Sequence, residues 1–429
     1  MINFATLQGL SIPEGVVTQI TDASGRVIWV AESDVVGGDA AVLEVEKVTS
    51  DTYVGESTYT NEQFILLNIY PKTNGTVSVT YGGLTKTITD TSGVEKPNAQ
   101  EVFFGTYGGV PDSVTTPTSG TLTIEGDYYA FGEATWKTSK TSYELAPTYG
   151  CFTKIVDLGK VTEIPLYAFY KSTKLTDVVV PKGVTSILGY AFSGCSQLRT
   201  VKIPSTVSAI TFGLMNAFNS CSTLSKINIA ANNENYRSEG SVIYSKDKTT
   251  LYWAENIGGT YTIPVSITSI EAYAFRNNKN LQRIAFPNEN NVHTISAYAF
   301  SNCSNMELVE IPEGITSIAG RAFFMPPTSK DITEVADTKM PKHITLPATI
   351  QSLGASVFAY AQYDTEGDFE EVCYLESLTL LSTTPPILES SVGWPAGSAS
   401  TITVPKGCAS KYKAADVWKD MGCTFVEAS

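Results

Sequence analysis

Residues 188–210 read LGYAFSGCSQLRTVKIPSTVSAI, and variations of this stretch return to the C-terminal end of the chain. Each copy has an Ala-Phe pair, a Cys or small residue three places after the Phe, a Leu, and an apolar-x-apolar segment before Pro. A repeat of 20–29 residues with this order is typical of a leucine-rich solenoid, in which each unit buries its apolar side against its neighbours. The marker phenylalanines are Phe169, Phe192, Phe218, Phe275, Phe300, Phe323 and Phe358.

Two intervals between marker phenylalanines are longer than the others. The interval after Phe218 holds one divergent unit, residues 236–253, and the interval after Phe323 holds an insertion, residues 325–340. The end of the chain departs from the repeat pattern, because residues 408–420 have helical spacing and are expected to form a closing cap. We therefore predict a mainly β fold in which residues 151–429 form a leucine-rich-repeat solenoid with a C-terminal cap.

Alternation along each repeat strand separates inward from outward positions. In the unit quoted above, Leu198, Val201 and Ile203 are expected to point inward, and Pro204 ends the strand because Pro cannot continue a ladder. The outward positions change from copy to copy. Such variation is compatible with a recognition surface and equally with simple solvent exposure. The candidate ligand-binding residues on this outward face are Lys202, Lys226, Asn228, Arg283, Glu310 and His343.

A tyrosine stands directly before the Ala-Phe pair in several repeats, and these tyrosines are expected to stack as a ladder. Aromatic side chains of this kind also contact sugars in glycan-binding surfaces. Packing between repeats and contact with a ligand are therefore both open for this ladder. Its members are Tyr167, Tyr190, Tyr273 and Tyr298.

The sequence contains little that predicts chemistry. Three of the seven cysteines, Cys195, Cys221 and Cys303, follow a marker Phe by three places, which predicts buried thiols and not disulfides. The chain has no CxxC pair, and its two histidines, His293 and His343, are expected at the surface. Because no known catalytic motif occurs either, we predict no enzyme, no metal site and no cofactor.

The charge balance limits the partners. The net charge of the 429-residue chain is -14, and this field repels nucleic acids and anionic lipid. No run of 18 apolar residues occurs, and the N-terminus lacks the pattern of a signal peptide, so neither membrane insertion nor export by that route is expected. The paired carboxylates Glu370 and Glu371 end an acidic segment, residues 364–371, that we expect to be a solvated insertion.

The repeats closely resemble BspA-like leucine-rich repeats. The segments IPLYAFYKSTKL, SILGYAFSGCSQL, SIEAYAFRNNKNL and ISAYAFSNCSNM carry this resemblance. Proteins with such repeats are commonly bacterial surface adhesins, so the resemblance implies a non-enzymatic adhesion protein whose partner is a bacterial surface protein or glycan.

The N-terminal region has a different organisation. Residues 1–31 predict a small hairpin and resemble the N-termini of tail-associated proteins of gut bacteriophages and prophages, which implies an attachment segment that contacts other virion proteins. Residues 38–117 contain strand patterns around an Asn74-Gly75 turn and resemble bacterial immunoglobulin-like modules, which implies a small β-sandwich. Residues 118–150 are expected to connect this domain to the repeats and to cap them.

The sequence leaves three hypotheses for the function: two are adhesion proteins in different locations, and the third is an enzyme. The leading hypothesis is a receptor-binding protein of a phage or prophage tail, assembled in the bacterial cytoplasm and located in the virion. The alternative is a leucine-rich-repeat adhesin on a bacterial cell surface. An enzyme that acts on glycans through an Asp/Glu pair is the third hypothesis. A homo-oligomer is compatible with all of them.

Overall fold

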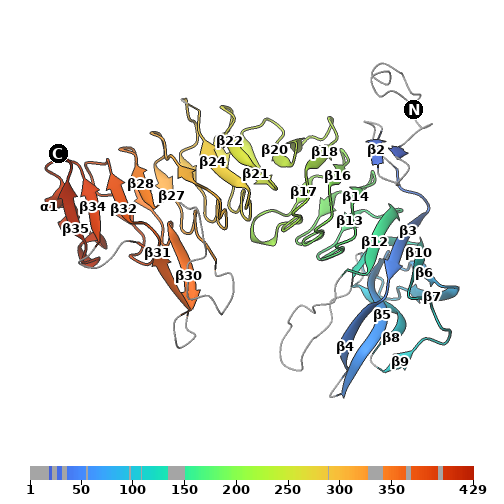
Figure 1. Cartoon of the computed structure of the whole chain (residues 1–429). Coiled ribbons are helices and arrows are strands. Elements are labelled where there is room, and N and C mark those ends of the chain that lie inside the picture. The colour runs from blue at the N-terminus through green and yellow to red at the C-terminus, as the bar shows by residue number, and fades with distance from the viewer. Residues whose placement is uncertain are drawn as a thin grey trace. The chain divides into compact units, whose positions relative to one another are not determined.

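The computed structural model describes residues 19–21, 27–30, 36–54, 57–95, 98–107, 109–133, 150–287, 289–326, 342–363, 369–394 and 400–429. These residues fall into two compact units (Figure 1). The first unit comprises Met1–Thr211 and Asn216–Asn235, and the second comprises Phe212–Met215 and Tyr236–Ser429. Strands dominate both units, and the mainly β fold predicted from the sequence is confirmed.

The N-terminal hairpin consists of β1 (Gln19–Thr21) and β2 (Val27–Val30), which pair antiparallel. It lies within residues 1–31, for which the sequence predicts a small hairpin. Most of residues 1–31, including the residues that carry the phage-like resemblance, lie outside the described residues. The predicted attachment role of this segment therefore stays a prediction.

Two sheets form the N-terminal β domain. The first contains, in spatial order, β12 (Phe152–Asp157), β3 (Ala40–Glu46), β10 (Ser119–Gly126), β6 (Thr76–Tyr81) and β7 (Leu84–Thr89). The second contains β11 (Tyr128–Glu133), β5 (Ser57–Pro71), β8 (Gln100–Tyr107) and β9 (Val110–Pro111), with β4 (Val48–Val54) paired to β5. The rings of Tyr81 and Phe104 join the two sheets, with their centroids 5.6 Å apart. Both side chains are fully buried, so the core of this domain lies between the sheets.

Two strands that lie beyond the predicted end of this domain, at residue 117, belong to its first sheet. Strand β10 lies in the middle of the first sheet, where it pairs with both β3 and β6, although residues 118–150 are predicted to be a connecting segment. Strand β12, at the predicted start of the repeats, pairs with β3. Sequence patterns do not show this, because the partners of these strands lie far away in the chain.

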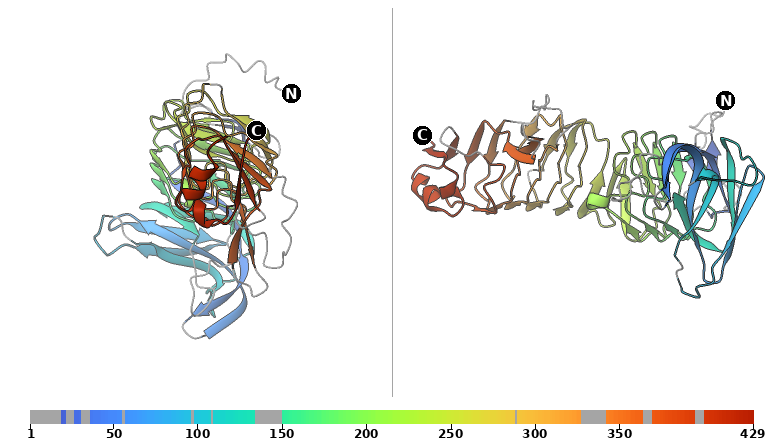
Figure 2. Two further views of the ribbon diagram at one scale, coloured as in Figure 1. Left: turned by 90° about the vertical axis from the view of Figure 1, so that its left-hand side faces the viewer. Right: turned by 90° about the horizontal axis from the view of Figure 1, so that it is seen from below.

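The first repeat stack follows directly within the same unit. Each coil contributes one short strand to each of two parallel sheets (Figure 2). One sheet contains β13 (Glu163–Ile164), β15 (Ser186–Ile187) and β17 (Ala209–Ile210). The other contains β14 (Asp177–Val179), β16 (Thr200–Ile203) and β18 (Lys226–Ile229).

The second unit contains the remaining coils. Its long sheet begins with antiparallel strands β19 (Tyr236–Glu239), β20 (Val242–Ser245) and β21 (Thr250–Ala254), and continues in parallel with β23 (Ser269–Ile270), β25 (Thr294–Ile295), β27 (Ser317–Ile318), β29 (Ser352–Leu353) and β33 (Ile387–Leu388). A second sheet contains β22 (Gly259–Thr262), β24 (Leu281–Ala285) and β26 (Leu308–Val309), and a third contains β28 (His343–Leu346), β32 (Ser377–Leu380), β34 (Thr401–Val404) and β35 (Thr424–Glu427). Strands β30 (Ala359–Tyr363) and β31 (Phe369–Cys373) pair antiparallel as a hairpin that projects from this region (Figure 1).

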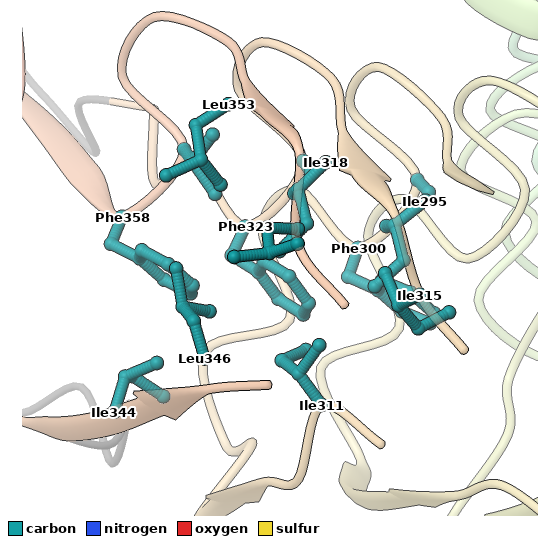
Figure 3. Close-up of a cluster of buried hydrophobic side chains, with 14 of the residues drawn as sticks. Ile295, Phe300, Ile311, Ile315, Ile318, Phe323, Ile344, Leu346, Leu353 and Phe358 are labelled. Carbon is teal, nitrogen blue, oxygen red and sulfur yellow. The ribbon is translucent and has the colours of Figure 1, made fainter. Parts of the chain in front are cut away.

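The marker phenylalanines stack inside each unit, as the repeat pattern predicts. In the first unit, neighbouring rings are 5.2 and 5.6 Å apart and nearly parallel; in the second, the spacings run from 5.0 to 5.3 Å. Figure 3 shows Phe300, Phe323 and Phe358 side by side in the core of the second unit. The main chain maintains this spacing, because the N–H of Phe300 donates to the carbonyl oxygen of Ala322 in the next coil at 2.8 Å.

The C-terminal cap agrees with the helical spacing of residues 408–420. It contains helix α1 (Ala409–Ala414) and the 3-10 turn η3 (Trp418–Asp420). The buried rings of Tyr412, Trp418 and Phe425 contact one another and cover the last coil. Part of the predicted insertion at residues 325–340 lies outside the described residues.

Candidate functional site

Three of the six candidate ligand residues gather on the outward face of β14, β16 and β18. Parallel pairing places Lys202 opposite Asn228 and Thr200 opposite Lys226. Because side chains alternate along a strand, all four project from the same face of the sheet. The residues between them point into the core and are buried: Val178, Val201 and Ile227. The outward orientation predicted for Lys202, Lys226 and Asn228 is therefore the one observed.

The two lysines on this face form an unusual electrostatic pair. Lys202 is half-buried and Lys226 is exposed. Burial lowers the pKa of Lys202 to about 8, and the neighbouring charge of Lys226 adds to this effect. Within the described part of the chain, neither lysine forms an ion pair with an acidic group. We refer to Lys202, Lys226 and Asn228 as the lysine site.

Arg283 and Glu310 neutralise each other in the second unit. The Nη2 atom of Arg283 lies 2.7 Å from Oε2 of Glu310, and both side chains are exposed. Exposed pairs of this kind contribute little to stability. They also leave little net charge for a ligand, so this pair differs from the lysine site.

His343 lies at the exposed end of β28. Its Nδ1 atom is 2.8 Å from Oγ of Ser377 on the neighbouring strand β32. Lys342 beside it forms an ion pair of 2.7 Å with Glu376. The six candidates thus do not form one cluster: three make up the lysine site, two pair with each other, and His343 belongs to a separate sheet of the second unit.

The tyrosine ladder stacks in two pairs, one in each unit. The rings of Tyr167 and Tyr190 are 5.2 Å apart, and those of Tyr273 and Tyr298 are 4.8 Å apart, with interplanar angles of 8° and 5°. All four residues have positive φ angles between 53° and 65°, which turn the chain into the Ala-Phe corner. Stacking covers one ring face of every tyrosine, so the ladder has a clear role in packing between coils.

Sequence reasoning missed the ion pair that ends this ladder. Arg321 occupies the position before Ala-Phe where other repeats have Tyr, and its Nη1 atom donates to the hydroxyl of Tyr298 at 3.0 Å. Its Nε and Nη2 atoms donate to Oε1 of Glu371 at 2.9 and 2.6 Å. Glu371 also accepts a hydrogen bond from Ser356, and its side chain is only 6% exposed. The prediction that Glu371 belongs to a solvated insertion is therefore wrong.

A buried carboxylate stands at the start of each repeat stack. Glu133, at the end of β11, accepts hydrogen bonds from the main-chain N–H groups of Gly150 and Cys151 at 2.8 to 3.0 Å. Burial raises the pKa of Glu133 to about 7. Glu255 directly follows β21, and burial raises the pKa of its carboxyl group to about 8. Both side chains are buried, at 4% exposure each.

The prediction of buried thiols is confirmed. Cys195, Cys221 and Cys303 are fully buried, and none of the seven cysteines forms a disulfide. Within the described residues, no group of three His, Cys, Asp or Glu side chains has the geometry to hold a metal ion. No helix in the same part of the chain is both long and apolar enough to cross a membrane.

The repeat region matches a known family. Residues 162–257 and 247–365 match the BspA type leucine rich repeat region, in six copies. These residues are therefore similar to BspA-type leucine-rich repeats, in agreement with the segments that surround the marker phenylalanines. No curated protein gives a match to the chain.

Three solved structures of bacterial proteins align with part of the chain. The pneumococcal vaccine antigen PcpA aligns at 18% identity and a TM-score of 0.45, over 64% of this chain and 69% of its own. A leucine-rich repeat protein from Bacteroides ovatus aligns at 18% identity and a TM-score of 0.33, over 65% and 66%. A leucine rich cell surface protein from Faecalibacterium prausnitzii aligns at 22% identity and a TM-score of 0.31, over 48% and 70%.

Proposed function

We propose that this protein is a non-enzymatic adhesion protein whose repeats recognise a ligand on a bacterial cell surface. One observation carries the proposal. The inward residues of the coils repeat as a buried core, while the outward residues of the same strands differ from coil to coil. Such an array holds many different side chains at fixed spacing, which suits recognition of an extended ligand.

We place the protein on a bacterial cell surface and keep the phage-tail hypothesis as its rival. The BspA-type repeats support this location, because the resemblance noted in the sequence implies a surface adhesin. The tail hypothesis draws on the resemblance of residues 1–31. Both hypotheses assign recognition of a bacterial surface to the repeats. They differ in whether the protein is attached to a bacterial cell or to a phage particle.

Two measurements test the proposal. The purified full chain, labelled with a fluorophore, should bind intact bacterial cells in a saturable manner, and unlabelled chain should compete. Antibodies against the chain should also detect it on intact cells of the bacterium that produces it. Absence of saturable binding to every strain of a panel of gut bacteria would overturn the adhesion proposal. If the antibodies detect the protein only in sedimented phage particles, the proposed cell-surface location is wrong and the protein belongs to the virion.

A further inference from the structure

We propose that the lysine site binds the acidic groups of an anionic glycan polymer, with one carboxylate or phosphate between the ammonium groups of Lys202 and Lys226. This inference rests on the proposed adhesion function and assigns a ligand class to it. The two strands β16 and β18 supply all the groups that it needs.

The geometry places several hydrogen-bond donors on one face. Lys202 lies opposite Asn228, and Lys226 lies opposite Thr200, so the two ammonium groups come from neighbouring strands and diagonal positions. The amide of Asn228 and the hydroxyl of Thr200 add neutral donors between them. Ammonium groups form their strongest hydrogen bonds with ionised oxygen acceptors, and carboxylates and phosphates offer several such oxygens.

The electrostatics of Lys202 favour an anion. Its side chain has lost part of its hydration and lies near a second positive charge, and both effects disfavour its own charge. Two other lysines of the array, in contrast, already have an acidic partner: Lys174 pairs with Glu46, and Lys342 pairs with Glu376. A bound anion would remove the unfavourable interaction between Lys202 and Lys226 and would replace the lost hydration.

The surrounding charges define the side from which the polymer approaches. On the strands that pair with β16, the charged groups are Asp177 on β14 and Lys226 on β18. Asp177 lies opposite Thr200, away from β18, and it repels an anion on that side. The net charge of -14 further disfavours densely charged polymers such as nucleic acids. A glycan with widely spaced acidic groups fits this combination better.

Binding should be coupled to uptake of a proton. With a pKa of about 8, Lys202 is about half neutral at pH 8, and only its charged form attracts the anion. Raising the pH above this pKa therefore weakens binding, by about tenfold between pH 7 and pH 9. The lysine pair thus predicts a pH dependence in a range where the acidic groups of the polymer do not titrate.

Isothermal titration calorimetry of the full chain at low salt tests the site. We expect binding of polygalacturonate, poly(glycerol phosphate) or both, and no binding of neutral dextran. Lys202→Gln and Lys226→Gln should each weaken binding at least about tenfold, and Lys202→Gln should remove the pH dependence. The control Lys342→Gln removes an exposed lysine that already has a partner, and it should bind as the wild type does.

The outcomes separate this site from the general function. Binding of only one polymer identifies the acidic group as carboxylate or phosphate. No binding of either polymer, or unchanged binding by folded Lys202→Gln, overturns the site. Equal Lys202-dependent binding of duplex DNA would overturn the assignment to a glycan. If the chain still adheres to cells in any of these cases, the adhesion function stands and another surface carries it.

Discussion

The thiol of Cys303 donates a hydrogen bond of 3.2 Å to the main-chain carbonyl oxygen of Phe275, one coil earlier. The position three places after a marker phenylalanine thus joins this coil to the preceding one. Asn278 occupies the same position, and its amide donates to the carbonyl oxygen of Ala254 at 2.8 Å. Small polar groups recur there because each satisfies a buried carbonyl group. The same thiol bond, at 3.1 Å, links Cys195 to Phe169 and Cys221 to Phe192.

These thiols should be unreactive in the folded protein. Burial raises the pKa of the Cys303 thiol, so the reactive thiolate is scarce as well as inaccessible. We expect iodoacetamide at pH 8 to leave Cys195, Cys221 and Cys303 unlabelled, while the partly exposed Cys423 reacts first. Peptide mass spectrometry measures each site, and labelling in denaturant serves as the control. Equal labelling of Cys303 and Cys423 in the native protein would show that the coil junctions are open.

The phenylalanine stack should dominate the stability of the second unit. Phe275 is fully buried and packs against Phe300 with a centroid distance of 5.0 Å. Phe275→Ala leaves a cavity and should lower the free energy of unfolding by about 3–5 kcal/mol in urea titrations. Leu214→Ala, at a side chain that is 53% exposed, is the matched control and should cost little. A loss below about 1 kcal/mol for Phe275→Ala would contradict the assigned core.

The buried carboxyl group of Glu255 should make the second unit less stable at high pH. Its folded pKa of about 8 lies above the ordinary value of 4.5, so its contribution is favourable below pH 4.5 and is lost as the pH rises towards 8. Glu255→Gln removes this cost and should raise the free energy of unfolding at pH 8.5 by at least about 1 kcal/mol, with little effect at pH 4.

Urea titrations at several pH values measure this effect. Glu389→Gln removes an exposed carboxylate and should leave the pH profile unchanged. If Glu255→Gln keeps the pH profile of the wild type, the carboxyl group of Glu255 has an ordinary pKa and is not buried in the folded protein.

The repeat architecture was predictable because its signals are local. The Ala-Phe pair, the inward apolar residues and the terminal Pro lie within one coil, and their recurrence predicts both the sheets and the ring stacks. The position of β10 between β3 and β6 was not predictable, because β10 pairs with segments about 80 and about 40 residues earlier in the sequence. The division of the repeats into two units also escaped prediction, although it falls in the long interval after Phe218.

The candidate site was predictable only in part. Strand alternation correctly predicted that Lys202, Lys226 and His343 point outward. Alternation does not show which outward charges are neutralised, since Arg283 meets Glu310 from the next coil, 27 residues away. Glu371 illustrates the same limit: its acidic neighbours suggest solvent exposure, and its burial depends on Arg321, 50 residues earlier.

Adsorption to bacterial cells after charge reversal at the lysine site tests the account most directly. Lys202→Glu/Lys226→Glu replaces two outward side chains, and at the exposed Lys226 such a change usually shifts stability by within about 0.5 kcal/mol. The control Lys279→Glu/Lys406→Glu makes the same charge change at two exposed lysines elsewhere in the array. With equal melting temperatures for all three proteins, we predict that the lysine-site variant loses adsorption while the control adsorbs as the wild type does. Normal adsorption of the folded lysine-site variant would contradict the account.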